Sequence, residues 1–384
     1  MSQQCIEMVA SGTAPLAVVI ITKVLGSAPR HEGTMMVFRP DGSSTGTVGG
    51  GLVELRAAEE AAKSLAGRRS SCVAVEMLGA QALGSDPICG GAVEFVVDFV
   101  ADTTLYSAAA TELAAGRDVF IKYAPVSPGG QIDGQLSVAV LGAGGAVLAG
   151  TSAGRPDADT IAAANAAADA ARRDVIHGTT GGAGQTASGQ MAAGRHSGAG
   201  SLFRAASGAP WLRVRPMDEL YVFGGGHVGR ALALFAAELG FVVTLVDTRP
   251  AFADADAYPE GIKVVQGDYA AIAKALPVRG STYIVVATPN HISDLETVAA
   301  VLGRGYRYAG FVASRRKTTL ILDQLKKDGF DPAEVDALRA PIGVDIGAET
   351  PAEIAVTICA ELIAARHASP ALATFDRDRA RRRA

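Results

Sequence analysis

Three glycines with a dinucleotide-type spacing carry the strongest chemical signal in the sequence. Residues 220–229 read LYVFGGGHVG, and Gly224, Gly226 and Gly229 fit the pattern GxGxxG between an apolar strand and a helix. The first glycine permits a tight turn, the second lets a pyrophosphate approach the backbone, and the third lets the helix pack on the sheet. Asp247 ends the next expected strand, where an acidic side chain can bind a ribose diol. We predict a nucleotide or phosphate site here; a turn used only for packing is the alternative.

His227 lies inside this turn, at a position that is commonly small in nucleotide-binding fingerprints. The imidazole can donate to an anion or take part in chemistry, and capping or packing would explain it as well. It is the first indication of a specialised site.

Cys89 lies in the string PICGGAVE, where two glycines follow the thiol. Their backbone N–H groups can form a nest that stabilises a thiolate, and a thiolate can accept sulfur or contact a soft metal. An inert buried cysteine is the competing interpretation. Cys72 and Cys359 alternate with apolar neighbours and are expected in the core, whereas Cys5 gives no functional indication.

Two further segments suit an anion. Gly49, Gly50 and Gly51 precede an expected helix that has Glu54 in its first turn, which predicts a second anion cradle or a tight strand-to-helix connection. Ser314, Arg315, Arg316 and Lys317 follow an expected strand, and ligands bind at the carboxyl ends of strands in doubly wound sheets. Arginine can grip a phosphate bidentately, although a solvated run of charges is the alternative.

The loop PIGVDIGAETP precedes the last expected helix. Thr350 is a suitable N-cap, with Pro351 at the first helical position and Glu353 completing a capping box. Asp345 has no such structural explanation and is therefore a candidate site residue.

The elements that must position these residues divide at about residue 216. Before it, β-branched runs at 16–25, 34–38, 72–78 and 93–100 predict strands, and 51–67 predicts a helix with Leu52, Leu55, Ala58 and Ala62 on one face. Gly67 is placed to end that helix. Residues 160–176 predict another helix, and the Gly-, Ala- and Ser-rich stretch 178–208 predicts a loop. We therefore expect a mixed α+β domain over 1–216.

Strands and helices alternate in 217–384, which predicts a Rossmann-like parallel sheet with right-handed crossovers. The composition sets further limits: the net charge of −4 and 5% aromatic residues give no indication of nucleic-acid binding. The apolar run 14–25 contains Lys23 and is too short to span a bilayer, so we expect a cytoplasmic protein without membrane contact.

Several strings together resemble the xanthine dehydrogenase accessory factor family (XdhC/CoxI). They are GSAPRHEG, GTVGGGLVE, ICGGAVE, FGGGHVGRALA, ATPNHISDLE, GFVASRRKT and APIGVDIGAETPAEIAVTICAELIA. They occur in the family's order between about residues 20 and 365. His291 and Asp294 stand where the family commonly has THxHxxD, with Pro289 and Asn290 replacing part of that string.

This resemblance implies a maturation factor for molybdenum hydroxylases of the xanthine dehydrogenase or CO dehydrogenase type. Such a protein would bind molybdenum cofactor, as molybdopterin or its dinucleotide form, while a sulfido ligand is installed, and deliver it to the apo-enzyme. Cys89 and His291 are then the candidates for chemistry, and a cysteine desulfurase or another sulfur donor is the second partner. We expect a homodimer that acts as a cofactor chaperone rather than a stand-alone enzyme.

Two other functions remain open. The glycine turn would also serve an oxidoreductase dependent on NAD(P), but no Tyr-x-x-x-Lys pair accompanies it. A nucleotide-sensing regulatory module is the third possibility, and it would leave Cys89 and the N-terminal motifs without a role.

Overall fold

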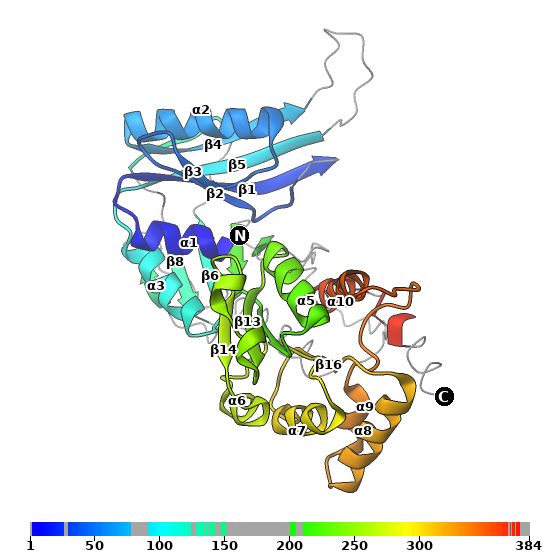
Figure 1. Ribbon diagram of the computed structural model, residues 1–384. Coiled ribbons are helices and arrows are strands. Elements are labelled where there is room, and N and C mark those ends of the chain that lie inside the picture. The colour runs from blue at the N-terminus through cyan, green and yellow to red at the C-terminus, as the bar shows by residue number, and fades with distance from the viewer. Residues whose placement is uncertain are drawn as a thin grey trace, which may run out of the picture. The chain divides into compact units, whose positions relative to one another are not determined.

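The computed structural model describes residues 2–26, 30–77, 91–123, 128–134, 136, 138–142, 147–150, 200–204, 210–367, 369, 371–372 and 374–376. The chain divides into two compact units, Met1–Arg172 with Ala183–Pro216, and Arg173–Gly182 with Met217–Ala384. Figure 1 shows their helices and strands along the chain. Cys89 and the expected helix 160–176 lie outside the described residues.

The N-terminal unit contains two sheets. The first has the order β3-β2-β1-β5-β4-β7 and the second has the order β10-β11-β6-β8-β9, and the strand pairs in both are antiparallel. The strands of the first sheet are β1 (Leu16–Gly26), β2 (Met35–Phe38), β3 (Ser44–Gly46), β4 (Arg69–Met77), β5 (Gly91–Val100) and β7 (Gln131–Asp133). Those of the second are β6 (Val119–Tyr123), β8 (Val138–Gly142), β9 (Val147–Gly150), β10 (Gly200–Arg204) and β11 (Pro210–Val214).

Helices cover both faces of the first sheet. Helix α2 (Gly51–Gly67) packs on one face, and α1 (Ser2–Ser11) and α3 (Thr104–Ala114) fill the core between the other face and the second sheet. The four strands and the helix predicted in this region are therefore confirmed. Helix α1 was not predicted, and β10 lies inside the stretch that was expected to be a loop.

The larger apolar residues of α2 do not form its buried face. Val53, Ala57 and Ala61 face the sheet, whereas Leu52 and Leu55 are 48% and 58% exposed. Alanine side chains let the helix approach the sheet closely, so the smaller residues form the buried stripe. The helix ends at Gly67 as predicted, and the residue that adopts the left-handed conformation at the C-cap is Arg68, with φ 52°.

The C-terminal unit is the predicted parallel sheet, with the order β14-β13-β12-β15-β16. Its helices cover both faces: α5 and α10 pack on one, and α6, α7, α8 and α9 on the other. The strands are β12 (Glu219–Phe223), β13 (Val242–Asp247), β14 (Lys263–Gln266), β15 (Thr282–Val286) and β16 (Tyr308–Phe311). The helices are α5 (His227–Glu238), α6 (Tyr269–Ala275), α7 (His291–Val301), α8 (Arg315–Lys327), α9 (Pro332–Ala337) and α10 (Pro351–Arg366).

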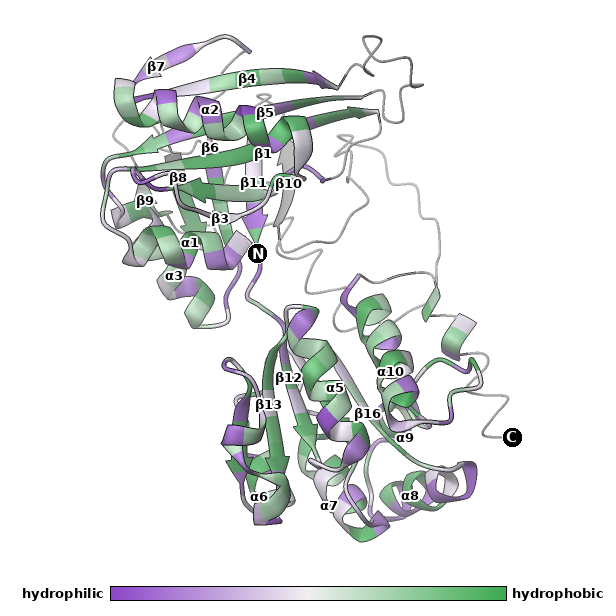
Figure 2. Cartoon of the chain, turned by 45° about the horizontal axis from the view of Figure 1, so that its top comes forward, coloured by the Kyte–Doolittle hydropathy of each residue, from purple (hydrophilic) through white to green (hydrophobic). Residues whose placement is uncertain are grey.

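This doubly wound arrangement explains the apolar strands, because a sheet covered on both faces buries successive side chains. In Figure 2 the strands β12 and β13 are largely green. The strand order reverses between β12 and β15, the point at which ligands bind in this fold class. Among the described residues, no helix has the length and apolar character required to cross a membrane.

Candidate functional site

Gly224 and Gly229 are required by packing. Gly224 has φ +113°, and a Cβ atom there would lie 2.2 Å from the carbonyl oxygen of Ala287, at the end of the neighbouring strand β15. A Cβ atom on Gly229 would lie 1.7 Å from the carbonyl oxygen of Gly224. These two glycines therefore bring strand, turn and helix together whether or not a ligand binds.

Gly226 has no such packing reason. Its φ of −61° is open to any residue, and a Cβ atom there would meet no heavy atom within 4 Å. Gly226 is the N-cap of α5 and makes no side-chain capping bond, so the helix begins in open space. A backbone without a side chain at a helix N-terminus suits the close approach of an anion. His227 is the first residue of the helix and is exposed.

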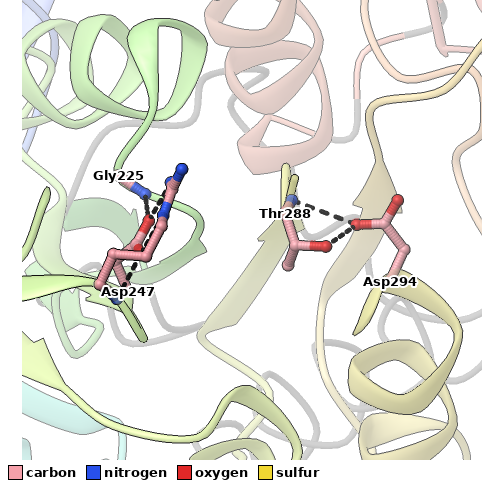
Figure 3. Close-up of polar contacts among 5 residues, drawn as sticks. Gly225, Asp247, Thr288 and Asp294 are labelled. Carbon is pink, nitrogen blue, oxygen red and sulfur yellow. Dashed lines mark hydrogen bonds and ion pairs between the residues drawn. The ribbon is translucent and has the colours of Figure 1, made fainter. Parts of the chain in front are cut away.

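Asp247 lies beneath the glycine turn, as Figure 3 shows, and its side chain is completely buried. Its Oδ2 accepts the N–H of Gly225 at 2.7 Å and Nη2 of Arg249 at 2.8 Å. Its Oδ1 accepts the backbone N–H and Nε of Arg249, both at 2.9 Å. Burial raises the pKa of this carboxyl, but the bonds from Arg249 and Gly225 outweigh it, so the pKa lies below its ordinary value. The structure thus gives Asp247 internal partners in place of the expected ribose diol.

A second polar group follows β15. Asp294 is completely buried in α7, and its Oδ1 accepts the N–H of Thr288 at 3.1 Å as well as the Thr288 hydroxyl (Figure 3). The other oxygen forms an ion pair with Nζ of Lys317. Asn290 has a structural role, since its side chain accepts the N–H of Ser293 and caps α7. His291 is the exposed first residue of that helix.

The basic run after β16 separates into two parts. Ser314 caps α8 by accepting the N–H of Lys317, and the Lys317 ammonium group pairs with buried Asp294. Arg315 and Arg316 are exposed in the first turn of α8, which contains no acidic residue. Two cations are unfavourable at the positive end of a helix dipole, so an external anion would stabilise them. The expectation of a phosphate contact therefore stands for the two arginines and not for Lys317.

The glycines before α2 have partners within their own loop. Thr47 Oγ1 accepts the N–H of Gly49 at 3.1 Å, and Glu54 Oε2 accepts the N–H of Gly50 at 2.9 Å. Gly51 is already the first residue of the helix. A carboxylate thus occupies the place that an anion would take, and the turn is explained without a ligand.

Asp345 lies exposed in the loop before α10. That loop is attached to α10 through Gly343, whose N–H donates to the buried carboxylate of Glu361 at 2.7 Å. The predicted capping box of Thr350 and Glu353 is confirmed.

Cys72 and Cys359 are buried, as predicted, and Cys5 is also completely buried, which the sequence did not indicate. Burial raises the pKa of the Cys5 and Cys359 thiols to about 11, so neither behaves as a reactive thiolate. Within the described part of the chain, no group of three or more His, Cys, Asp or Glu residues could hold a metal ion.

The doubly wound sheet and its glycine turn define a Rossmann-type domain, and the comparisons specify the family. Residues 10–76 match the XdhC and CoxI family, and residues 220–362 match the XdhC Rossmann domain. Together these matches cover more than half of the 384 residues, and the chain belongs to the XdhC and CoxI family. The resemblance stated from the sequence motifs is confirmed.

Two curated proteins are similar to this chain. YqeB of Escherichia coli (strain K12) is 26% identical over 359 residues, which are 93% of this chain and 44% of YqeB. A protein of Bacillus subtilis (strain 168) that is described as a probable subunit of xanthine dehydrogenase is 29% identical over 154 residues, 40% of this chain and 44% of that protein. The chain thus spans less than half the length of these curated relatives.

A crystal structure described as a xanthine dehydrogenase from Bacillus halodurans has the same fold. It matches with a TM-score of 0.71 at 21% identity, over 96% of both chains.

Proposed function

We propose that this protein is an accessory factor in the maturation of a molybdenum hydroxylase of the xanthine dehydrogenase type. Membership of the XdhC and CoxI family supports this function, as does the name of the Bacillus subtilis relative. In this role the protein binds molybdenum cofactor as cargo and serves its sulfuration and its insertion into the apo-enzyme. The apo-hydroxylase and a sulfur donor are then its partners.

The observation that carries the proposal is the open space around Gly226. Every form of molybdopterin bears a phosphate, and a phosphate needs donors that no side chain obstructs. Gly226 offers this at the N-terminus of α5, and packing does not explain why this position lacks a side chain. Arg315 and Arg316 follow a strand of the same sheet and would add positive charge on the far side of β15.

The sulfur chemistry rests on fewer residues. Among the three described cysteines, none is an exposed thiol. Cys89 therefore remains the candidate for handling sulfur, and the exposed His291 remains the candidate for a proton-transferring group near the cargo.

The test is Gly226→Val. The new side chain meets no neighbour, so the fold should be unchanged, while its methyl groups occupy the space that a phosphate needs. Loss of one or two charge-assisted hydrogen bonds should weaken binding about ten- to a hundred-fold. The measurement is calorimetric titration with molybdenum cofactor under anaerobic conditions, with thermal unfolding as the check on the fold.

Ala62→Val, on an exposed turn of α2, is the control for adding a valine to a helix. If the folded Gly226→Val protein binds the cofactor as tightly as the wild type, the glycine turn is not the binding site. If the wild-type protein does not bind the cofactor, the carrier function itself is wrong.

A further inference from the structure

The carboxylate that would recognise a ribose already accepts hydrogen bonds from a neighbouring arginine. Asp247 stands at the end of β13, where dinucleotide-binding domains place the acid that binds the ribose hydroxyls. Each of its oxygens already accepts two N–H groups, and three of the four come from Arg249. A ribose diol would have to break a bidentate, charge-assisted pair, which is among the strongest polar contacts in proteins.

The guanidinium group of Arg249 is held from a second side. Its central carbon lies 3.8 Å from the centroid of the Phe252 ring, a stacking distance, and Phe252 belongs to the short helix that follows β13 (Pro250–Phe252). The arginine side chain nevertheless remains 39% exposed. Arg249 is therefore a fixed cation with an open surface, and only Asp247 Oδ2 separates its Nη2 from the N–H of Gly225 in the glycine turn.

We propose that Arg249 determines which ligand the glycine turn accepts: a phosphate monoester, and not a nucleotide with a free ribose diol. A phosphate monoester carries nearly two negative charges at neutral pH, more than the single charge on each phosphate of an internal pyrophosphate. A cation beside the turn favours the former. The same cation removes the acceptor that a ribose diol needs.

This inference rests on the proposed function for its natural ligand. For a cofactor carrier it means the form of molybdopterin that ends in a phosphate, since the dinucleotide form brings a ribose with it. A nucleotide phosphorylated on its ribose is the other source of the same chemistry, because an arginine near this position accommodates such a phosphate in this fold. The choice of probe distinguishes the phosphate of molybdopterin from a phosphate on a nucleotide ribose.

The variant is Arg249→Ala, and the probes are NADH and NADPH, whose binding is followed by fluorescence. The substitution should leave Asp247 folded in place, because two backbone N–H groups, those of Gly225 and residue 249, still donate to it. Since the side-chain donors of Arg249 no longer occupy the carboxylate, NADH affinity should rise at least about ten-fold over the wild type, the value of one charge-assisted hydrogen bond.

Arg230→Ala is the matched control. Arg230 also lies near an aromatic ring, at 5.5 Å from the Tyr258 centroid, and donates to the backbone oxygen of Ala257 at 3.3 Å. The control variant removes the same charge without touching Asp247. NADH affinity should stay within about two-fold of the wild type in this variant, a difference below the effect of one lost hydrogen bond.

Two results would overturn the role of Arg249: wild-type protein that binds NADH tightly and as well as NADPH, or an Arg249→Ala protein whose NADH affinity does not rise. If the wild type binds NADPH tightly, the natural ligand carries its phosphate on a ribose. If the wild type binds both nucleotides weakly, the natural ligand carries its phosphate on the pterin. Titration with the two cofactor forms completes the design. If both cofactor forms bind equally well, the proposed selectivity is wrong but the proposed function is not. If neither form binds, the proposed function is wrong, and the NADH affinities of the wild type and of Arg249→Ala still test the role of Arg249.

Discussion

Removal of the Lys317 ammonium group should destabilise the C-terminal unit far more than an ordinary surface charge would. Asp294, its partner, is completely buried, and the Lys317 side chain is only 26% exposed. In Lys317→Met the alkyl chain and its packing remain, but the Asp294 carboxylate loses its counter-ion. The two donors from Thr288 stay in place, so the charge is hydrogen-bonded but no longer compensated.

Breaking a buried ion pair from one side costs about 3–5 kcal/mol. Because Lys317 keeps contact with water and Thr288 still donates to Asp294, we expect the lower end of that range, about 3 kcal/mol. For a unit of this size the change corresponds to a fall in the melting temperature of roughly 10 °C. Asp294→Asn in the same protein should restore most of the loss, since a neutral amide oxygen can accept both Thr288 bonds.

The assay is a double-mutant cycle by urea unfolding, with Lys326→Met as the control. Lys326 lies on the same helix and pairs with Asp336 at 2.8 Å, but the two side chains are 37% and 57% exposed. Exposed pairs contribute about 0–1 kcal/mol, so this variant should unfold nearly as the wild type does. If Lys317→Met costs no more than Lys326→Met, or if Asp294→Asn does not compensate, burial of the pair is not the source of its contribution.

Two other predictions concern the arginines of α8 and a buried acid of the N-terminal unit. Arg315→Gln with Arg316→Gln should weaken cofactor binding several-fold and flatten its salt dependence, without the stability loss of Lys317→Met. Calorimetry at two salt concentrations measures this. If the variant binds the cofactor as tightly as the wild type, the two arginines are only a solvated surface. Burial raises the pKa of Asp98 from 3.8 to about 6. Its contribution to stability is therefore complete below about pH 4 and is lost as the pH rises through 6, by up to about 3 kcal/mol. Asp98→Asn should remove that part of the pH dependence in urea unfolding, and an unchanged slope would show that another group titrates.

The alternation of elements in the C-terminal unit was predictable because a doubly wound sheet has a distinct pattern. Strands buried on both faces read as short β-branched runs, and helices of similar length must separate parallel strands. Helix α6 was missed, since its seven residues are too few to show an amphipathic period. The short helix α9 was not predicted for the same reason.

In the N-terminal unit, the size of the apolar residues does not identify the buried face of α2. Leu52 and Leu55 are the larger apolar residues, yet Val53, Ala57 and Ala61 are the buried ones. The choice between two adjacent stripes depends on how closely the helix lies to the sheet, and that distance is a tertiary property. Helix α1 has ten residues, with no acidic residue in its first turn and no basic residue in its last turn, so no capping or dipole signal marked it.

For the site, the positions were predictable and their partners were not. GxGxxG and an acid at the end of the next strand follow from the fold, and both lie where expected. Whether Asp247 faces a ligand or an arginine two residues later depends on the path of the chain after β13. The sequence VDTRP does contain that arginine.

The same reasoning applies to Lys317. Because two arginines precede it in the sequence, it was expected to contact a ligand with them. Three adjacent basic residues at a helix start point in different directions, because successive residues are rotated by about 100° around the axis. The third of them, in the first turn, faces α7 and meets a carboxylate that would otherwise be buried without a counter-ion. A run of like charges can therefore serve two purposes. Only the buried acid opposite Lys317 shows that this residue stabilises the fold, whereas its two neighbours are free to bind a ligand.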